Sequence, residues 1–237
     1  MKRFVSILLV LLLVLGGVFA ATPPQVTNAA FLMGAGSYTV DTNIDINVFF
    51  DQPVILSGNV SVGLNSGGTA NYLTGVGSNA LTLRYLVQAG ENSANLDFNS
   101  DFNLLVANTL KDVGDTLDAN TELGPFSLSG SGIIIDTNSP IIIDVDTNTP
   151  DGNYNAGDSI DLNVIFSENV YLVGGNPVLT VNTGENATYI EGTGTPYLIF
   201  RYTIGSDKFA ADLNYPTVDV LNPAGGITDL AGNDANT

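Results

Sequence analysis

Two segments of the chain alternate apolar and polar residues in the same way. In each, apolar side chains occupy four alternate positions: Ile44, Ile46, Val48 and Phe50 in the first, and Ile160, Leu162, Val164 and Phe166 in the second. A period of two is typical of a β-strand with one face in a hydrophobic core. The sequence therefore predicts two equivalent strands with these side chains buried, each followed by a short polar loop, at 51–53 and 167–169.

This similarity extends over most of the chain, which is a tandem repeat. Matched residues lie 116 or 117 positions apart, as in Tyr38 and Tyr154, Phe50 and Phe166, and Arg84 and Arg201. The last match joins 118–121 to 234–237, where the sequence ends, so 122–135 has no counterpart in the second copy. We expect 122–135 to hold the last strand of the repeat, and the natural protein to continue beyond residue 237.

Short segments of strand character, separated by turn formers such as Ser66-Gly67-Gly68, fill the first copy. Their predicted bounds are 26–30, 43–50, 54–64, 70–74, 80–87, 104–110 and 124–135. No segment has a convincing amphipathic helical pattern. The expected fold is all-β: two tandem immunoglobulin-like antiparallel β-sandwiches, the second lacking its last strand. An up-and-down barrel is the structural alternative.

The first 20 residues have the parts of a secretory signal peptide. Lys2 and Arg3 precede an apolar run, and Val18 and Ala20 supply the small residues of a cleavage site. We expect cleavage after Ala20, with an uncleaved anchor helix as the alternative. The expected organisation is a signal peptide at 1–20, a first repeat at 21–139 and a second repeat at 140–237. The protein is then secreted or at the cell surface, with no membrane segment left after cleavage.

Charge and residue types narrow the functional classes. The chain has 24 Asp and Glu against 6 Lys and Arg, for a formal net charge of −18. Such a balance repels nucleic acids and anionic membrane surfaces, and it favours cations. The absence of Cys and His excludes disulfides, thiol chemistry, histidine-dependent triads and the usual zinc sites. With few glutamates and no Trp to stack a sugar, we expect no enzymatic activity.

The chain resembles a known group in five segments: 135–140, 151–160, 166–170, 187–194 and 227–235. These are similar to the tandem immunoglobulin-like (cadherin-like) repeats of very large secreted and surface proteins of bacteria, including biofilm-associated adhesins. The resemblance covers nearly all of the chain after residue 20. It implies a non-catalytic stalk or spacer that adjoins further repeats of the same chain and presents modules for cell adhesion to surface glycans or proteins.

The strongest chemical candidate is a calcium site at the joint between the copies. In a sandwich of this strand order, two loops lie at the end facing the preceding repeat. They bring Glu168, Asp229 and Asn233 near the linker residue Asp136. Calcium prefers such carboxylate and amide oxygens, and converging carboxylates repel one another unless a cation is present. The alternative is that these are solvated turn residues.

Further positions bear on this site. Asp144 and Asp146 are either extra ligands or plain surface residues. In the first copy Ala35, Thr42 and Gln52 stand where the second has Asp151, Asp158 and Glu168, so an equivalent site there is in doubt.

Carbohydrate binding is the alternative function, as an accessory module of an enzyme, because β-sandwiches often bind glycans through exposed aromatic side chains. Four tyrosines recur in the two copies at positions that we expect to face the core: Tyr72, Tyr85, Tyr189 and Tyr202.

Overall fold

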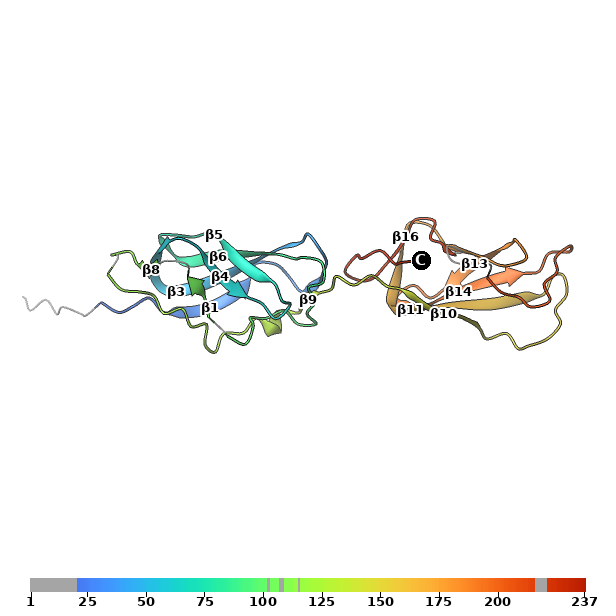
Figure 1. The fold of residues 1–237 in the computed structure, drawn as a ribbon, viewed down its shortest axis with the longest axis horizontal. Coiled ribbons are helices and arrows are strands. Elements are labelled where there is room, and N and C mark those ends of the chain that lie inside the picture. The colour runs from blue at the N-terminus through green and yellow to red at the C-terminus, as the bar shows by residue number, and fades with distance from the viewer. Residues whose placement is uncertain (1–20, 102, 107–108, 115, 216–220) are drawn as a thin grey trace, which may run out of the picture.

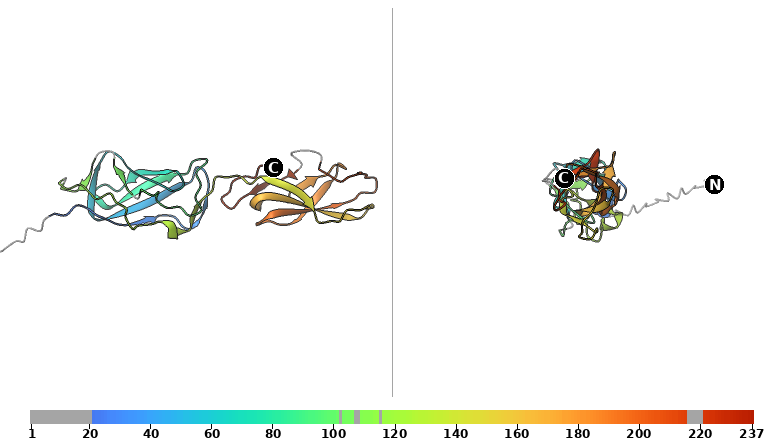
Figure 2. Two further views of the ribbon diagram at one scale, coloured as in Figure 1. Left: turned by 60° about the horizontal axis from the view of Figure 1, so that its bottom comes forward. Right: turned by 90° about the vertical axis from the view of Figure 1, so that its right-hand side faces the viewer.

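The computed structural model describes residues 21–237 except 102, 107–108, 115 and 216–220. The predicted signal peptide at 1–20 lies outside this range. The described chain forms two β-sandwich-like units arranged end to end, as the fold prediction requires (Figure 1). A view along the long axis superimposes both units in one small outline (Figure 2). No helix among the described residues is long and apolar enough to cross a membrane.

The first unit is built on one sheet that curls into two layers. Its strand order is β1-β3-β6-β5-β4-β7, with β8 paired to β3, while β2 and β9 form a separate parallel pair. The strands are β1 (Val26–Phe31), β2 (Gly36–Tyr38), β3 (Asn43–Ser57), β4 (Val60–Gly63), β5 (Thr69–Thr74), β6 (Ser78–Leu86), β7 (Leu105–Val106), β8 (Thr109–Asp112) and β9 (Ile133–Ile135). A 3₁₀ turn, η1 (Ser129–Ser131), precedes β9.

The second unit repeats this topology, with the order β10-β11-β14-β13-β12-β15 and with β16 paired to β11. Its strands are β10 (Ile142–Thr147), β11 (Ser159–Val173), β12 (Val178–Thr180), β13 (Asn186–Glu191), β14 (Thr195–Thr203), β15 (Leu221–Asn222) and β16 (Gly226–Thr228). Register is also repeated: Arg84 lies opposite Asp45, and Arg201 lies opposite Asp161. Each arginine forms an ion pair at 2.7 Å with that aspartate.

One long strand in each unit replaces the predicted strand and polar loop. β11 continues through 167–169, and its register with β14 shifts between Ile165 and Val170. Before this bulge β11 pairs with β10 and β14, and after it Tyr171–Val173 pairs with β16. β3 behaves in the same way, so the predicted loops at 51–53 and 167–169 are wrong. A bulge bends the strand and lets it pass from one layer to the other without ending.

Two other predicted strands also differ from the structure. The segment 104–110 forms parts of β7 and β8, which pair with different strands, β4 and β3. The segment 124–135 is mostly irregular, and only β9 at its end is a strand. Gly124 and Gly132 have φ values of 49° and 71°, a left-handed backbone that interrupts an extended strand.

The alternating side chains form the core of each unit as predicted, with one exception. Seven of the eight are buried: Ile44, Ile46, Val48, Phe50, Ile160, Val164 and Phe166. Leu162 is only partly buried and lies at the margin of the second core. Among the recurring tyrosines, Tyr85 and Tyr202 are buried, whereas Tyr72 and Tyr189 are partly buried against the core.

Candidate metal site

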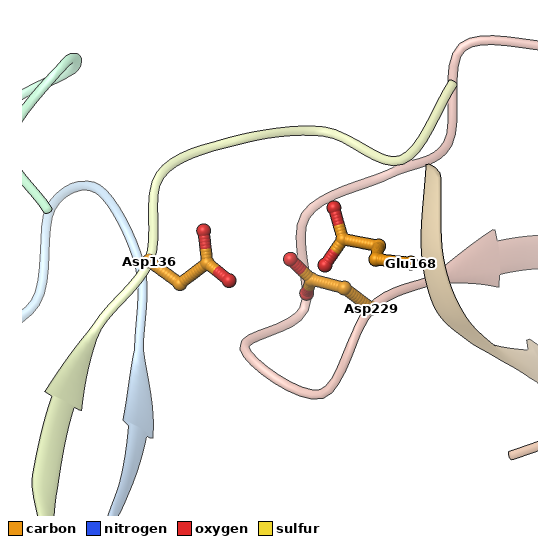
Figure 3. A group of neighbouring side chains, drawn as sticks. All are labelled: Asp136, Glu168 and Asp229. Carbon is orange, nitrogen blue, oxygen red and sulfur yellow. The ribbon is translucent and has the colours of Figure 1, made fainter. Parts of the chain in front are cut away.

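Three carboxylates converge at the joint between the two units. Asp136 follows β9 in the linker, Glu168 lies in the bulge of β11, and Asp229 follows β16 (Figure 3). One carboxylate oxygen of each lies within 4.8 Å of those of the other two. Asp136 and Glu168 are half-buried, and Asp229 is buried with 4% of its surface exposed. The structure therefore brings together the three acidic residues predicted for the site.

A tight loop after β16 holds the side chain of Asp229. Its Oδ1 accepts hydrogen bonds from the backbone N–H groups of Gly232 at 2.7 Å and Asn233 at 2.8 Å. Its Oδ2 accepts a bond from Nδ2 of Asn233 at 2.6 Å. The backbone N–H of Asp229 donates to the carbonyl oxygen of Asn233 at 3.1 Å, which closes the loop. These bonds hold the Asp229 carboxylate in position without a bound ion.

Asn233 connects the loop to the preceding unit. Its Nδ2 donates to the carbonyl oxygen of Asp136 at 2.9 Å, and its Oδ1 accepts a hydrogen bond from the hydroxyl of Thr39. Its amide group therefore bridges the second unit to the linker and to the end of the first. We predicted Asn233 as a metal ligand. The structure places it at the joint, where its amide oxygen already has a donor, and its role as a ligand stays a prediction.

The electrostatic environment of Glu168 is unfavourable to its charge. Burial, followed by the negative charges of Asp136 and Asp229, raises the pKa of the Glu168 carboxyl above its usual value. No cationic group contributes to this shift among the described residues. A cation bound between the three carboxylates would reverse the effect, because it would replace repulsion with attraction.

The donor set favours a hard divalent cation. Carboxylate oxygens suit Ca²⁺, Mg²⁺ and Mn²⁺, and the chain has no Cys or His to offer softer ligands. Ca²⁺ accepts six to eight oxygens in irregular geometry, including water and backbone carbonyls, whereas Mg²⁺ demands near-octahedral geometry. The structure supplies three carboxylates from three separate segments, two of them half-buried, which could hold a cation of this group.

The first unit contains part of the same arrangement, at a residue that we did not predict from the sequence. Asp112 is the last residue of β8, and Asp229 is the first residue after β16. The Oδ1 atom of Asp112 accepts hydrogen bonds from the backbone N–H groups of Thr116 and Leu117. These bonds, that from Leu117 foremost, lower the pKa of the Asp112 carboxyl. The offset of 117 that relates Arg84 to Arg201 aligns Asp229 with Asp112, and the offset becomes 116 only after this loop, which is one residue longer in the first unit. This offset was the sequence signal that could have identified Asp112, and the register of β8 and β16 gives the same correspondence.

Asp144 and Asp146 lie away from the three converging carboxylates. Both are exposed on β10, and their Oδ1 atoms accept bonds from the next residues, Val145 and Thr147, at 2.8 and 2.7 Å. Neither belongs to the acidic group that the structure forms among its described residues. This placement matches that of plain surface residues.

Comparison with protein-family models and with the sequences of curated proteins finds no match for this chain. The class of protein is therefore defined by the structure itself: an all-β chain of two repeated sandwich-like units with an acidic joint.

Proposed function

We propose that this chain is a non-catalytic extracellular stalk whose two units are held in line by a calcium ion at the joint. The proposal includes secretion and a cell-surface role in adhesion, where the units hold further modules away from the cell. The observation that carries it is the convergence of Asp136, Glu168 and Asp229, which come from the linker and from two segments of the second unit. An ion there would tie the linker to the second unit.

Two features support a role in stiffness. The units lie end to end, so the angle at the joint determines the reach of the whole chain (Figure 1). The linker is also tied at both ends: the N–H of Asp136 donates to Tyr38 at 3.0 Å, and Asn236 donates to Pro140 at 2.8 Å. Calcium would add a charged contact to these neutral bonds. The affinity that we expect is about 10⁻⁴–10⁻³ M, the range typical of extracellular calcium modules.

Thermal unfolding and small-angle X-ray scattering in calcium and in excess chelator test the proposal. At a calcium concentration a hundredfold above the dissociation constant, we expect about 2.7 kcal/mol of stabilisation. The scattering should show a longer, narrower particle in calcium. Glu168→Gln should remove most of both responses, because it deletes one of the three charges.

Glu191→Gln is the matched control. It makes the same change on an exposed residue of β13 in the same unit that does not belong to the acidic group, and it should leave both responses intact. If the chelator changes neither the melting curve nor the scattering of the original protein, the acids are turn residues and the proposal is wrong.

A further inference from the structure

Two residues of the first unit face the joint because two of its strands end together. β2 and β9 are parallel neighbours, and their last residues, Tyr38 and Ile135, lie opposite each other. Parallel strands carry the chain in the same direction, so the next residues, Thr39 and Asp136, leave the first unit at the same end. The backbone N–H of Asp136 donates to the carbonyl oxygen of Tyr38 at 3.0 Å, which ties the two segments together. The carboxylate of Asp136 points from this end toward the second unit (Figure 3).

The side chain of Asn233 meets this end of the first unit from the second unit. Its Oδ1 accepts a hydrogen bond from the hydroxyl of Thr39. Its Nδ2 donates to the carbonyl oxygen of Asp136 at 2.9 Å and to Oδ2 of Asp229 at 2.6 Å. These three hydrogen bonds form the amide bridge of the joint. All three are partly buried, which limits competition from water.

The first unit shows that the loop does not need this side chain in order to close. Leu117 occupies the position of Asn233, because its backbone N–H donates to Oδ1 of Asp112 and its carbonyl oxygen accepts from the N–H of Asp112. The backbone of Asn233 forms the same two bonds with Asp229. A leucine side chain has no donor or acceptor, yet the loop closes with it. The amide group of Asn233 therefore has a separate role at the joint.

The orientation of the amide group limits what that role is. The NH₂ group of Asn233 faces two acceptors, a carbonyl oxygen of Asp136 and a carboxylate oxygen of Asp229. Turning the amide over would place Oδ1 against these two oxygens, and neither of them can donate to it. Oδ1 consequently faces Thr39 in the first unit rather than the carboxylates.

We propose that Thr39 and Asn233 are positioning residues of the joint, and that neither is a ligand of the ion. Through the amide bridge they hold the end of the first unit against the loop of Asp229, which keeps the Asp136 carboxylate beside Asp229 and Glu168. The amide bridge acts without metal, whereas its effect on calcium rests on the proposed function. An ion then binds to a linker that is already ordered, and the ordering cost of binding is smaller.

Thr39→Val is the decisive variant, because valine has the shape of threonine without the hydroxyl. In excess chelator, small-angle X-ray scattering should show a broader distribution of particle lengths than for the original protein, because the first unit loses its bond to Asn233. In calorimetric titrations, calcium should bind about threefold to tenfold more weakly, the effect of one lost hydrogen bond. If Oδ1 of Asn233 were a ligand, this variant would free it, and calcium would bind as tightly as before or more tightly.

Three further variants sharpen the test. Thr39→Ser keeps the hydroxyl and should behave as the original protein does. Thr27→Val is the matched control, because the Thr27 hydroxyl donates to Phe49 at 3.3 Å within the first unit, and it should change neither measurement. Asn233→Leu introduces the residue with which the loop of the first unit closes, so it also serves if Thr39→Val fails to fold. It should weaken calcium binding at least as much, and adding Thr39→Val to it should have no further effect, because both remove the same bridge.

The two measurements separate this proposal from the proposed function. If the original protein binds no calcium, the proposed function is wrong, and the scattering in chelator still tests the amide bridge. Unchanged scattering of Thr39→Val in chelator would overturn the proposal. So would unchanged or tighter binding of calcium by Thr39→Val in a protein that binds it, an equal response of Thr27→Val, or additive effects of Thr39→Val and Asn233→Leu.

Discussion

The two units share a strand order and a register, yet their cores differ in size. Among the described residues, the core cluster of the first unit contains 22 buried apolar side chains and that of the second contains 11. Four of the additional residues lie in 122–135, the segment without a counterpart: Leu123, Leu128, Ile133 and Ile135. The exposure of a matched aromatic pair also differs: Phe98 is 3% exposed, and its counterpart Tyr215 is 43% exposed. One short segment therefore closes a core that the sheet alone leaves open.

The units differ in a second way at the end that faces the N-terminus. Both have an aspartate held by a tight loop, Asp112 or Asp229. Only the second combines it with a glutamate in the strand bulge, because Gln52 stands at the position of Glu168. Gln52 instead donates a hydrogen bond to the carbonyl oxygen of Thr22 at 2.7 Å. The loop aspartate is thus a structural element of both units, and a metal site needs the additional acids.

Equivalent leucines should show the largest difference between the units. Leu96→Ala should cost the first unit about 2–5 kcal/mol, because Leu96 is fully buried under β9. Leu213→Ala should cost the second unit less than about 1 kcal/mol, because Leu213 is partly exposed and leaves no closed cavity. Urea unfolding, with hydrogen exchange to assign each transition, gives both values. Equal costs would mean that β9 does not account for the difference between the cores.

Removing the charge of the loop aspartates should separate folding from metal binding. Without calcium, Asp112→Asn and Asp229→Asn should each destabilise their own unit, because an amide cannot accept all the bonds of the carboxylate. For the buried Asp229 we expect a cost of about 1–3 kcal/mol. Asp229→Asn should also abolish the stabilisation that calcium gives the protein, whereas Asp112→Asn should leave that stabilisation intact. The measurement is chemical unfolding of both variants in calcium and in chelator. A calcium response that survives Asp229→Asn would contradict the site.

The smallest effect concerns pH. Without metal, the pKa of Glu168 is raised in the folded chain, so its contribution to stability is full below the unfolded pKa and is lost as pH rises through the folded value. The free energy of unfolding of the original protein minus that of Glu168→Gln should therefore fall from acidic to neutral pH. We expect a change below about 1 kcal/mol, because water screens this partly exposed side chain.

The pKa of Asp112 is shifted in the opposite direction from that of Glu168. Its pKa is lowered by backbone hydrogen bonds, so its stabilisation is present above the unfolded pKa and is lost as pH falls through the folded value. The difference between the original protein and Asp112→Asn should therefore rise from acidic to neutral pH. Unfolding curves in chelator at several pH values measure both differences. If both differences change in the same direction as pH rises, the electrostatic account of Glu168 is contradicted.

The sequence by itself determined the all-β class, the repeat and the buried faces of β3 and β11. Alternation with period two requires no tertiary information, because successive side chains of a strand point to opposite faces. It also indicated that Asp136, Glu168 and Asp229 meet, since the strand order of a sandwich places their loops at one end.

Only the tertiary structure decided the remaining features. A bulge has no distinct residue pattern, so the passage of β11 through Glu168 into the other layer depended on the pairing partners on either side. That Asp112 and Asp229 both accept backbone hydrogen bonds from the loop that follows them depended on the conformation of that loop. Leu162 has the same alternating pattern as Ile46, yet it is less buried, because burial depends on whether another segment covers the side chain. In the first unit Leu128, Ile133 and Ile135 belong to the hydrophobic core, whereas in the second unit Leu162 lines a cavity of about 340 Å³.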